Sequence, residues 1–240
     1  QGAINTIADN PTEVVSYVTA HDNLNLWDKV LATMGLDATN PYNSIVEENI
    51  LDNEGIKRDL LANGIVFTSQ GISFMHAGEE FLRSKPKADG GFDHNSYASP
   101  DSVNSMKWNT LDEAANKTAY NYYKGLIQFR KAHASMTQMN DAQSCYKFVE
   151  NLDKGVIAYE LAKADGEVSD GIFVVHNATT GDVTVNLPAG NWTICVQGEK
   201  AGTTSLGTAS GSITVSGIST TILVVVGILA FISLLSSAKL

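Results

Sequence analysis

Two short polar clusters carry the side chains best suited to chemistry. The first is His21-Asp22-Asn23, and the second runs from His76 to the pair Glu79 and Glu80. Each cluster follows a short apolar run, which is the arrangement expected where a strand of a parallel sheet ends at a binding site. Carboxylates accept hydrogen bonds from hydroxyl groups, and an imidazole can donate one. The two clusters therefore favour recognition of a ligand rich in hydroxyl groups.

Aromatic rings are available to cover the apolar face of a sugar. Tyr17 and Trp27 flank the first cluster, and Tyr97 lies in the long aperiodic stretch 84–109. Loops of that length inside compact domains are usually functional. A structural interpretation stays open for both clusters. His21 and Asp22 could form a pair that ends a strand, and the two glutamates could begin a helix, where carboxylates favour the positive end of the dipole.

Strands and helices alternate in the first half of the sequence. The apolar run 14–18 is typical of a strand buried on both faces, and the run 72–76 predicts a second strand. Apolar residues at helical spacing predict helices over 54–68 and 112–134. This alternation indicates βα units and a parallel sheet, which would place both polar clusters at one edge.

The sequence changes character near residue 140. Short β-branched runs separated by Gly, Asn and Asp predict strands at 146–149, 156–161, 172–176, 183–187, 192–196, 212–215 and 221–225. Regular short strands with such turns indicate an antiparallel β-sandwich. We therefore expect an α/β part over residues 1–138, an all-β part over 139–226 and an apolar tail over 227–240.

Charge and cysteine content exclude several functions. The 240 residues carry a formal net charge of −10, which argues against a nucleic-acid partner. Two cysteines, Cys145 and Cys195, cannot form a disulfide framework, and no metal-ligand spacing is present. No cofactor is evident, and nothing in the sequence supports a calcium site.

The apolar run 222–235 is shorter than the about 20 residues of a membrane span, which leaves membrane contact by the tail open.

Several segments resemble, in the same order, those of type I pullulanases in the alpha-amylase superfamily, glycoside hydrolase family 13. YVTAHDNLNLWDKV (17–30) resembles the segment in which a His-Asp pair closes barrel strand seven, and TSQGISFMHAGEEFLRSK (68–85) resembles the strand-eight segment. HNSYASPDSVNSMKW (94–108) looks like the loop after strand eight, and YYKGLIQFRKAH (122–133) looks like the last barrel helix. GVIAYEL and GIFVVHNATTGDVTVNLPAGNW are similar to the C-terminal β-sandwich.

The resemblance implies a fold and an activity. The fold would be the last part of a (β/α)8 TIM barrel, about strands seven and eight with their helices, followed by the β-sandwich. The activity would be retaining hydrolysis of α-1,6 links in pullulan, amylopectin and limit dextrins through two carboxylates. Asp22 would match the acidic residue that stabilises the transition state. Substrate-binding roles would fall to His21, Asn23, Glu79, Asn95, Tyr97 and Asp101.

The resemblance also implies that essential parts are missing. Strands one to six, with the nucleophile and the acid/base, would precede Gln1. We therefore expect this chain alone to be inactive, and its unpaired strands to expose apolar flanks. The alternatives are an isoamylase-like or other enzyme of the superfamily, and a non-catalytic carbohydrate-binding surface module. The Gly/Thr/Ser/Asn-rich second half suits a secreted or cell-surface protein, with a cytoplasmic location as the alternative.

Overall fold

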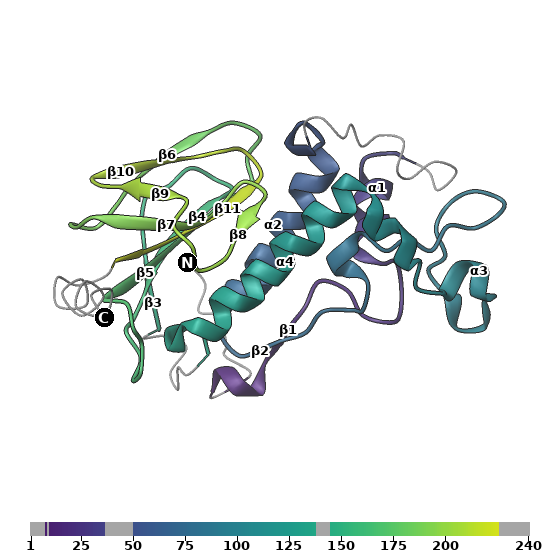
Figure 1. The fold of residues 1–240 in the computed structure, drawn as a ribbon, viewed down its shortest axis with the longest axis horizontal. Coiled ribbons are helices and arrows are strands. Elements are labelled where there is room, and N and C mark those ends of the chain that lie inside the picture. The colour runs from purple at the N-terminus through teal and green to yellow at the C-terminus, as the bar shows by residue number, and fades with distance from the viewer. Residues whose placement is uncertain (1–7, 9, 37–49, 138–144, 226–240) are drawn as a thin grey trace, which may run out of the picture.

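A large antiparallel sheet organises the molecule, with two long helices on one of its faces and a small sheet on the other (Figure 1). The computed structural model describes residues 8, 10–36, 50–137 and 145–225. The predicted tail 227–240 and the predicted domain boundary at 138/139 lie outside these residues. Within the described residues, no helix is both long and apolar enough to cross a bilayer.

The N-terminal half contains a parallel pair of very short strands. Strand β1 (Val15–Ser16) pairs with β2 (Ile72–Ser73), with Val15 opposite Ile72. Between the two strands the chain forms α1 (Leu26–Thr33), the turn η2 (Ile50–Asp52) and α2 (Glu54–Thr68). The predicted parallel pairing and the predicted helix 54–68 are thus confirmed.

The long helices α2 and α4 (Ala114–Ala132) lie beside each other against the large sheet (Figure 1). Asn53 caps α2 by accepting a hydrogen bond from the Ile56 amide at 3.1 Å. Each helix turns a glycine toward the sheet: a Cβ on Gly64 would collide with Thr220, and one on Gly125 would collide with Ala201. The helices can therefore approach the sheet closely because these two positions lack a side chain.

The stretch 84–109 is a loop with short helical turns, as its lack of periodicity predicts. The described residues of the N-terminal half, inside and outside this stretch, also form these short elements: η1 (Pro11–Glu13), η3 (Glu79–Phe81), η4 (Ser96–Ala98), α3 (Asp101–Asn104), η5 (Trp108–Asp112) and η6 (Ala134–Met136). None of them is longer than five residues. The shape of this region is therefore set by side-chain hydrogen bonds, described below.

The C-terminal half is all β. The large sheet has the order β3-β4-β5-β11-β7-β8, with β9 also paired to β7, and the small sheet pairs β10 with β6. The bounds are β3 (Tyr146–Phe148), β4 (Val156–Leu161), β5 (Gly171–Asn177), β6 (Val183–Asn186), β7 (Trp192–Gln197), β8 (Lys200–Ala201), β9 (Gly207–Ala209), β10 (Ser212–Val215) and β11 (Ser219–Val225). Every predicted strand is present. Strands β8 and β9 were not predicted, because neither has an apolar or alternating pattern.

The central strand β5 is buried along its whole length. Ile172 and Val174 point toward α2 and α4, whereas Phe173 and Val175 point toward the small sheet. The side chains of a strand alternate between its two faces, so one strand serves two cores. This double burial explains why the sequence of β5 reads as a continuous apolar run.

The strand pair β1–β2 differs from the prediction of burial on both faces. Val15 is 49% exposed, Tyr17 is 56% exposed, and Ile72 is 51% exposed. Each strand has one partner among the described residues, so its outer edge and part of its surface lack cover. The expected exposure of apolar flanks is therefore present. A closed barrel is not formed by the residues described.

Candidate functional site

The first polar cluster lies on the surface, at the edge where β1 ends. The side chains of His21 and Asp22 are 87% and 80% exposed, and His21 Nε2 lies 3.6 Å from Asp22 Oδ2. Asn23 has a φ of 64°, a left-handed conformation that asparagine tolerates better than most residues. Because β1 and β2 are parallel, the second cluster leaves the sheet at the same edge. The imidazole and carboxylate of the first cluster are thus open to a ligand.

Glu79 does not share this exposure, so the expected ligand contact needs correction. Its side chain is buried, with 3% exposed. One carboxylate oxygen accepts a hydrogen bond from Thr19, and the other accepts one from Asn63 Nδ2 at 3.3 Å. Burial raises the pKa of Glu79 to about 7, although these hydrogen bonds oppose the rise. Glu79 therefore supports the loop of the first cluster from below, through Thr19.

A second buried carboxyl group continues this network. Asn63 also donates to the Tyr123 hydroxyl at 2.8 Å, and Tyr123 donates to Asp59 Oδ1 at 2.5 Å. Burial, with a smaller contribution from the nearby Glu79, raises the pKa of Asp59 to about 8. The network joins the end of β1 to α2 and α4. Asp59 stays largely protonated at neutral pH and Glu79 about half protonated, because a buried carboxylate without a cation is unfavourable.

The residues expected after strand eight also lie on the surface. Tyr97 is 89% exposed, and Asn95 and Asp101 are exposed as well. Asp93 shapes their loop by accepting hydrogen bonds from the Asn95 amide at 3.0 Å and from Ser99 Oγ at 2.5 Å. These hydrogen bonds lower the pKa of Asp93. An aromatic face and polar groups are therefore presented from a loop of defined shape.

Lys85 connects the two exposed groups, and sequence reasoning missed it. Its backbone amide donates to Asp28 Oδ2 of α1 at 2.8 Å, and its ammonium group donates to Ser96 Oγ at 2.8 Å. Helix α1 follows His21-Asp22-Asn23, and Ser96 lies between Asn95 and Tyr97. Both Asp28 and Lys85 are buried. Burial raises the pKa of Asp28 to about 6 and lowers that of Lys85. Residue types alone gave no signal of this link.

The aromatic candidates divide by exposure. Trp27 is 1% exposed and belongs to the core, so it cannot cover a sugar, whereas Tyr17 and Tyr97 remain accessible. No hydrogen bond or ion pair between described residues joins His21, Asp22 or Asn23 to Asn95, Tyr97 or Asp101. The described ranges also contain no group of three or more His, Cys, Asp or Glu side chains placed to hold a metal ion. The arrangement is suited to hydrogen bonding of hydroxyl groups and to stacking.

Known pullulanases are similar to this chain in sequence. A family model described as "Pullulanase, all-beta domain" matches residues 143–200. The pullulanase of Bacillus subtilis (strain 168) is 32% identical over 190 residues, which cover 78% of this chain and 23% of the relative. The chain thus spans less than a quarter of the length of that relative.

Solved structures agree with the sequence comparison. A pullulanase from Bacillus acidopullulyticus superposes with a TM-score of 0.75 at 36% identity, over 90% of this chain and 24% of that one. The type I pullulanase of Bacillus subtilis in complex with maltose gives a TM-score of 0.75 at 28% identity, over 95% of this chain and 29% of that one. By sequence and by fold, this chain is therefore a homologue of pullulanases over a part of their length.

Proposed function

We propose that this chain forms part of a starch-debranching glycoside hydrolase that cleaves α-1,6 links in pullulan, amylopectin and limit dextrins. In this proposal β1 and β2 are the last two strands of a (β/α)8 barrel, and the two stacked sheets are the β-sandwich that follows it. The observation that carries the proposal is the exposed His21–Asp22 pair at the carboxyl end of β1, in a chain homologous to pullulanases.

Asp22 has the main chemical role in this proposal. Its carboxylate accepts hydrogen bonds from ring hydroxyls, and these tighten as the sugar approaches an oxocarbenium-like transition state, with a contribution of several kcal/mol. His21 donates to the same sugar, and Asn23, Asn95, Tyr97 and Asp101 contact neighbouring sugars. The nucleophile and the acid/base belong to a longer enzyme, so the chain alone does not hydrolyse glucans. The maltose in the Bacillus subtilis homologue supports an α-glucan as the ligand.

The exposed apolar strands support the barrel assignment. Val15 and Ile72 in the strands, and Tyr17 and Phe74 directly after them, are each more than two-fifths exposed, which is unusual for the strands of a parallel sheet and their ends. Further parallel strands on both sides of the pair would cover them. A secreted or cell-surface location is part of the proposal, because pullulan and amylopectin are polymers too large to enter a cell intact.

The test is release of reducing sugar from pullulan by the complete enzyme that contains this chain, with linear amylose as the comparison substrate. We expect maltotriose from pullulan and little product from amylose. Asp22→Asn should lower kcat/KM on pullulan by about a thousandfold or more, because several kcal/mol of transition-state stabilisation is removed.

The matched control is Asp101→Asn, an exposed carboxylate at the first residue of α3 that should change KM more than kcat. Unchanged turnover in Asp22→Asn would overturn the role of Asp22. Hydrolysis of amylose would move the assignment to an amylase-like enzyme, and no hydrolysis of either polymer would favour a carbohydrate-binding module.

A further inference from the structure

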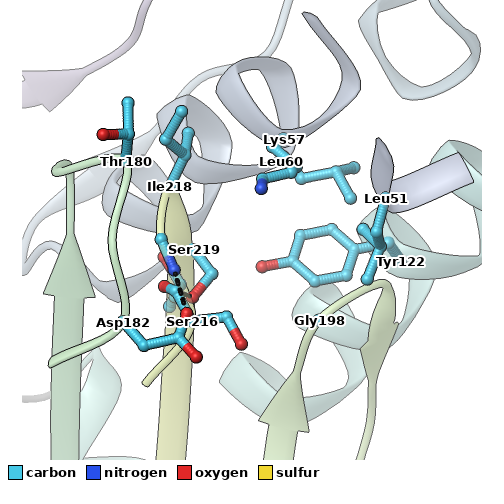
Figure 2. A pocket seen from close by; sticks show the side chains of 12 residues that line it. Leu51, Lys57, Leu60, Tyr122, Thr180, Asp182, Gly198, Ser216, Ile218 and Ser219 are labelled. Atoms are coloured by element: carbon cyan, nitrogen blue, oxygen red, sulfur yellow. Dashed lines mark hydrogen bonds between the residues drawn. The ribbon is translucent and has the colours of Figure 1, made fainter. Parts of the chain in front are cut away.

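A cavity of about 230 Å³ lies where the helices meet the loops of the sheets (Figure 2). One wall comes from η2, α2 and α4, with Leu51, Lys57 and Tyr122. The opposite wall comes from the β5–β6 and β10–β11 connections, with Asp182, Ser216 and Ile218 among its residues. The cavity shares no residue with the exposed His21–Asp22 site.

The sheet-side wall is held rigidly by one buried side chain. Asn177 is completely buried, and its Nδ2 donates to the carbonyls of Gly181, Val215 and Ser216 at 2.8, 3.2 and 3.1 Å. Its Oδ1 accepts from the Thr179 amide at 3.0 Å and from the Thr179 hydroxyl at 2.7 Å. A single amide thus ties the two connections together. The wall keeps its shape without a ligand, and this lowers the entropy lost on binding.

A strained residue sits in that wall. Ile218 has a φ of 51°, which is a genuine outlier for a β-branched residue. Its amide donates to the Thr179 carbonyl at 2.8 Å, and its side chain lines the cavity. Such strain persists only where the surroundings impose it, and it concentrates at ligand clamps and other functional sites.

The free polar groups of the cavity point to a neutral ligand with several hydroxyls. Asp182 uses Oδ1 to accept from the Gly217 amide at 3.2 Å, which leaves Oδ2 available. Lys57 makes no ion pair with another described residue, so its ammonium group can donate. One cation and one carboxylate balance in charge, so neither an anion nor a cation is favoured overall.

The apolar lining and the size narrow the ligand further. Leu51, Leu60 and Ile218 offer an apolar surface, and Tyr122 points its hydroxyl toward the β11 side of the cavity (Figure 2). The volume of about 230 Å³ is below the about 300–1,000 Å³ of pockets for drug-sized ligands. A single six-membered ring with hydroxyl groups fits these limits better than a chain of sugars.

We infer that this cavity is a second binding site, for one hexose unit such as glucose, with Lys57 and Asp182 bonding its hydroxyls and Leu51, Leu60 and Ile218 packing on its C–H face. This site goes beyond the proposed hydrolysis, and it does not require the chain to be catalytic. A ligand there bridges α2 to the β10–β11 connection, so binding joins the helical half to the sheet half.

The test is titration of the 240-residue chain with glucose, followed by methyl NMR and by calorimetry. We expect saturable shifts of the Ile218, Leu51 and Leu60 methyl signals with a Kd on the order of 1–10 mM, the affinity typical of a small ligand with few contacts. Lys57→Met keeps the aliphatic stem and removes the donor. It should weaken binding by about tenfold, because a hydrogen bond to a charged group is lost.

The matched control is Lys124→Met, an exposed lysine of α4 outside the cavity, which should bind glucose like the unmodified chain. Asp182→Asn keeps the acceptor for the Gly217 amide, so it preserves the loop and should weaken binding by about fivefold. The absence of saturable shifts, shifts confined to Val15 and Val18 near the exposed site, or equal binding by Lys57→Met would each overturn the inference. Melting curves of the variants establish that each one is folded.

Discussion

The two halves of the molecule satisfy their polar groups to different degrees. Within the described residues, nearly all buried side-chain nitrogen and oxygen atoms without a hydrogen-bond partner belong to the N-terminal half. They include Asp59 Oδ2 and Asn63 Oδ1. The sheet half contributes Thr221 Oγ1. By contrast, every polar side-chain atom of the buried residues Asn177 and His176 in the sheet half has a hydrogen-bond partner.

The halves differ in the same way in their apolar surface. Val15 of β1, Ile72 of β2 and Tyr17 directly after β1 are exposed, whereas the central strand β5 exposes none of its residues. Natural proteins tolerate unpaired strand edges and buried charge chiefly where another element or a ligand meets them. Among the described residues, the sheet half exposes fewer large apolar side chains, Phe148 of β3 and Ile157 of β4 among them. The N-terminal half is therefore the part better shaped to meet another element or a ligand.

The largest expected effect concerns the buried acids of the N-terminal half. The pKa of Asp59 is raised from 3.8 to about 8, so the folded state keeps a proton that the unfolded state loses. The stabilisation that Asp59 contributes should therefore fall as the pH rises from about 4 to about 8, by on the order of 5 kcal/mol. Glu79, with a pKa of about 7, should add to the loss over a narrower range. Urea unfolding across this range measures the effect.

Asp59→Asn is the decisive variant for that prediction. The amide imitates the neutral acid and can still accept a hydrogen bond from Tyr123, so the fold should persist. The loss of stability between about pH 4 and about pH 8 should become much smaller. A slope equal to that of the unmodified chain would show that Asp59 is ionised in the folded state, and the contrast between the two halves would weaken.

The next effect concerns the core between the two sheets. Phe173 is 1% exposed and packs edge-to-face on Trp192, with ring centroids 5.8 Å apart. Phe173→Ala should lower the free energy of unfolding by about 3–5 kcal/mol, because it leaves a cavity in a closely packed core. Chemical denaturation measures the loss. A change below about 1 kcal/mol would mean that the sheet half is loosely packed, contrary to the comparison.

His176 gives the sheet half an acid dependence of opposite sign. Burial lowers the pKa of His176 from 6.5 to about 4, and its ring nitrogens contact Thr68 at 3.1 Å and Thr220 at 2.9 Å. Between these two pKa values His176 is protonated in the unfolded state and neutral in the folded state. The stabilisation that His176 contributes should therefore fall as the pH drops from about 6.5 to about 4, by on the order of 3 kcal/mol. Between about pH 4 and about pH 6.5 this rise of stability with pH opposes the fall that Asp59 causes, so the two nearly cancel in the unmodified chain. His176→Gln should therefore make stability fall with rising pH over this range as well.

Glu167 acts in a lower and separate pH range. Burial opposes its ionisation, but hydrogen bonds from His133, Ser135 and Ser169 lower the pKa of Glu167 to about 2. Its contribution to stability is present above about pH 4.5 and is lost as the pH falls toward about 2. A single transition that spans both ranges and survives in His176→Gln would assign the whole acid dependence to Glu167.

The sequence predicted the parts of the fold that depend on periodicity. Helix α2 was placed correctly at both ends because Asn53 caps it and its apolar residues keep helical spacing. Strands β4 and β10 were placed correctly because each is a short β-branched or apolar run bounded by turn residues. Strands β8 and β9 were not predicted, because their stability comes from pairing with β7, and tertiary structure sets that pairing.

The sequence predicted the exposed residues of the candidate site, but it did not predict how the buried residues beneath them are connected. Asp22 and Tyr97 lie on the surface, as a ligand contact requires, and their sugar-binding roles stay predictions. The position of Glu79 depends on Thr19, 60 residues away in the sequence, and that of Lys85 depends on Asp28. No pattern of residue types reveals such long-range contacts, so buried carboxylates and exposed ones look alike in the sequence.

The smallest effect on stability concerns the exposed strand pair. Tyr17 and Phe74 form an edge-to-face contact with ring centroids 6.0 Å apart, and they are 56% and 42% exposed. Phe74→Ser should cost about 0.5–1.5 kcal/mol, the range of one aromatic pair. The same change should clearly reduce self-association of the chain in sedimentation velocity, because it removes apolar surface beside an open strand edge. Self-association that is unaffected by Phe74→Ser but abolished by a polar substitution in the sheet half would reverse the comparison, since the sheet half would then be the part shaped to meet a partner.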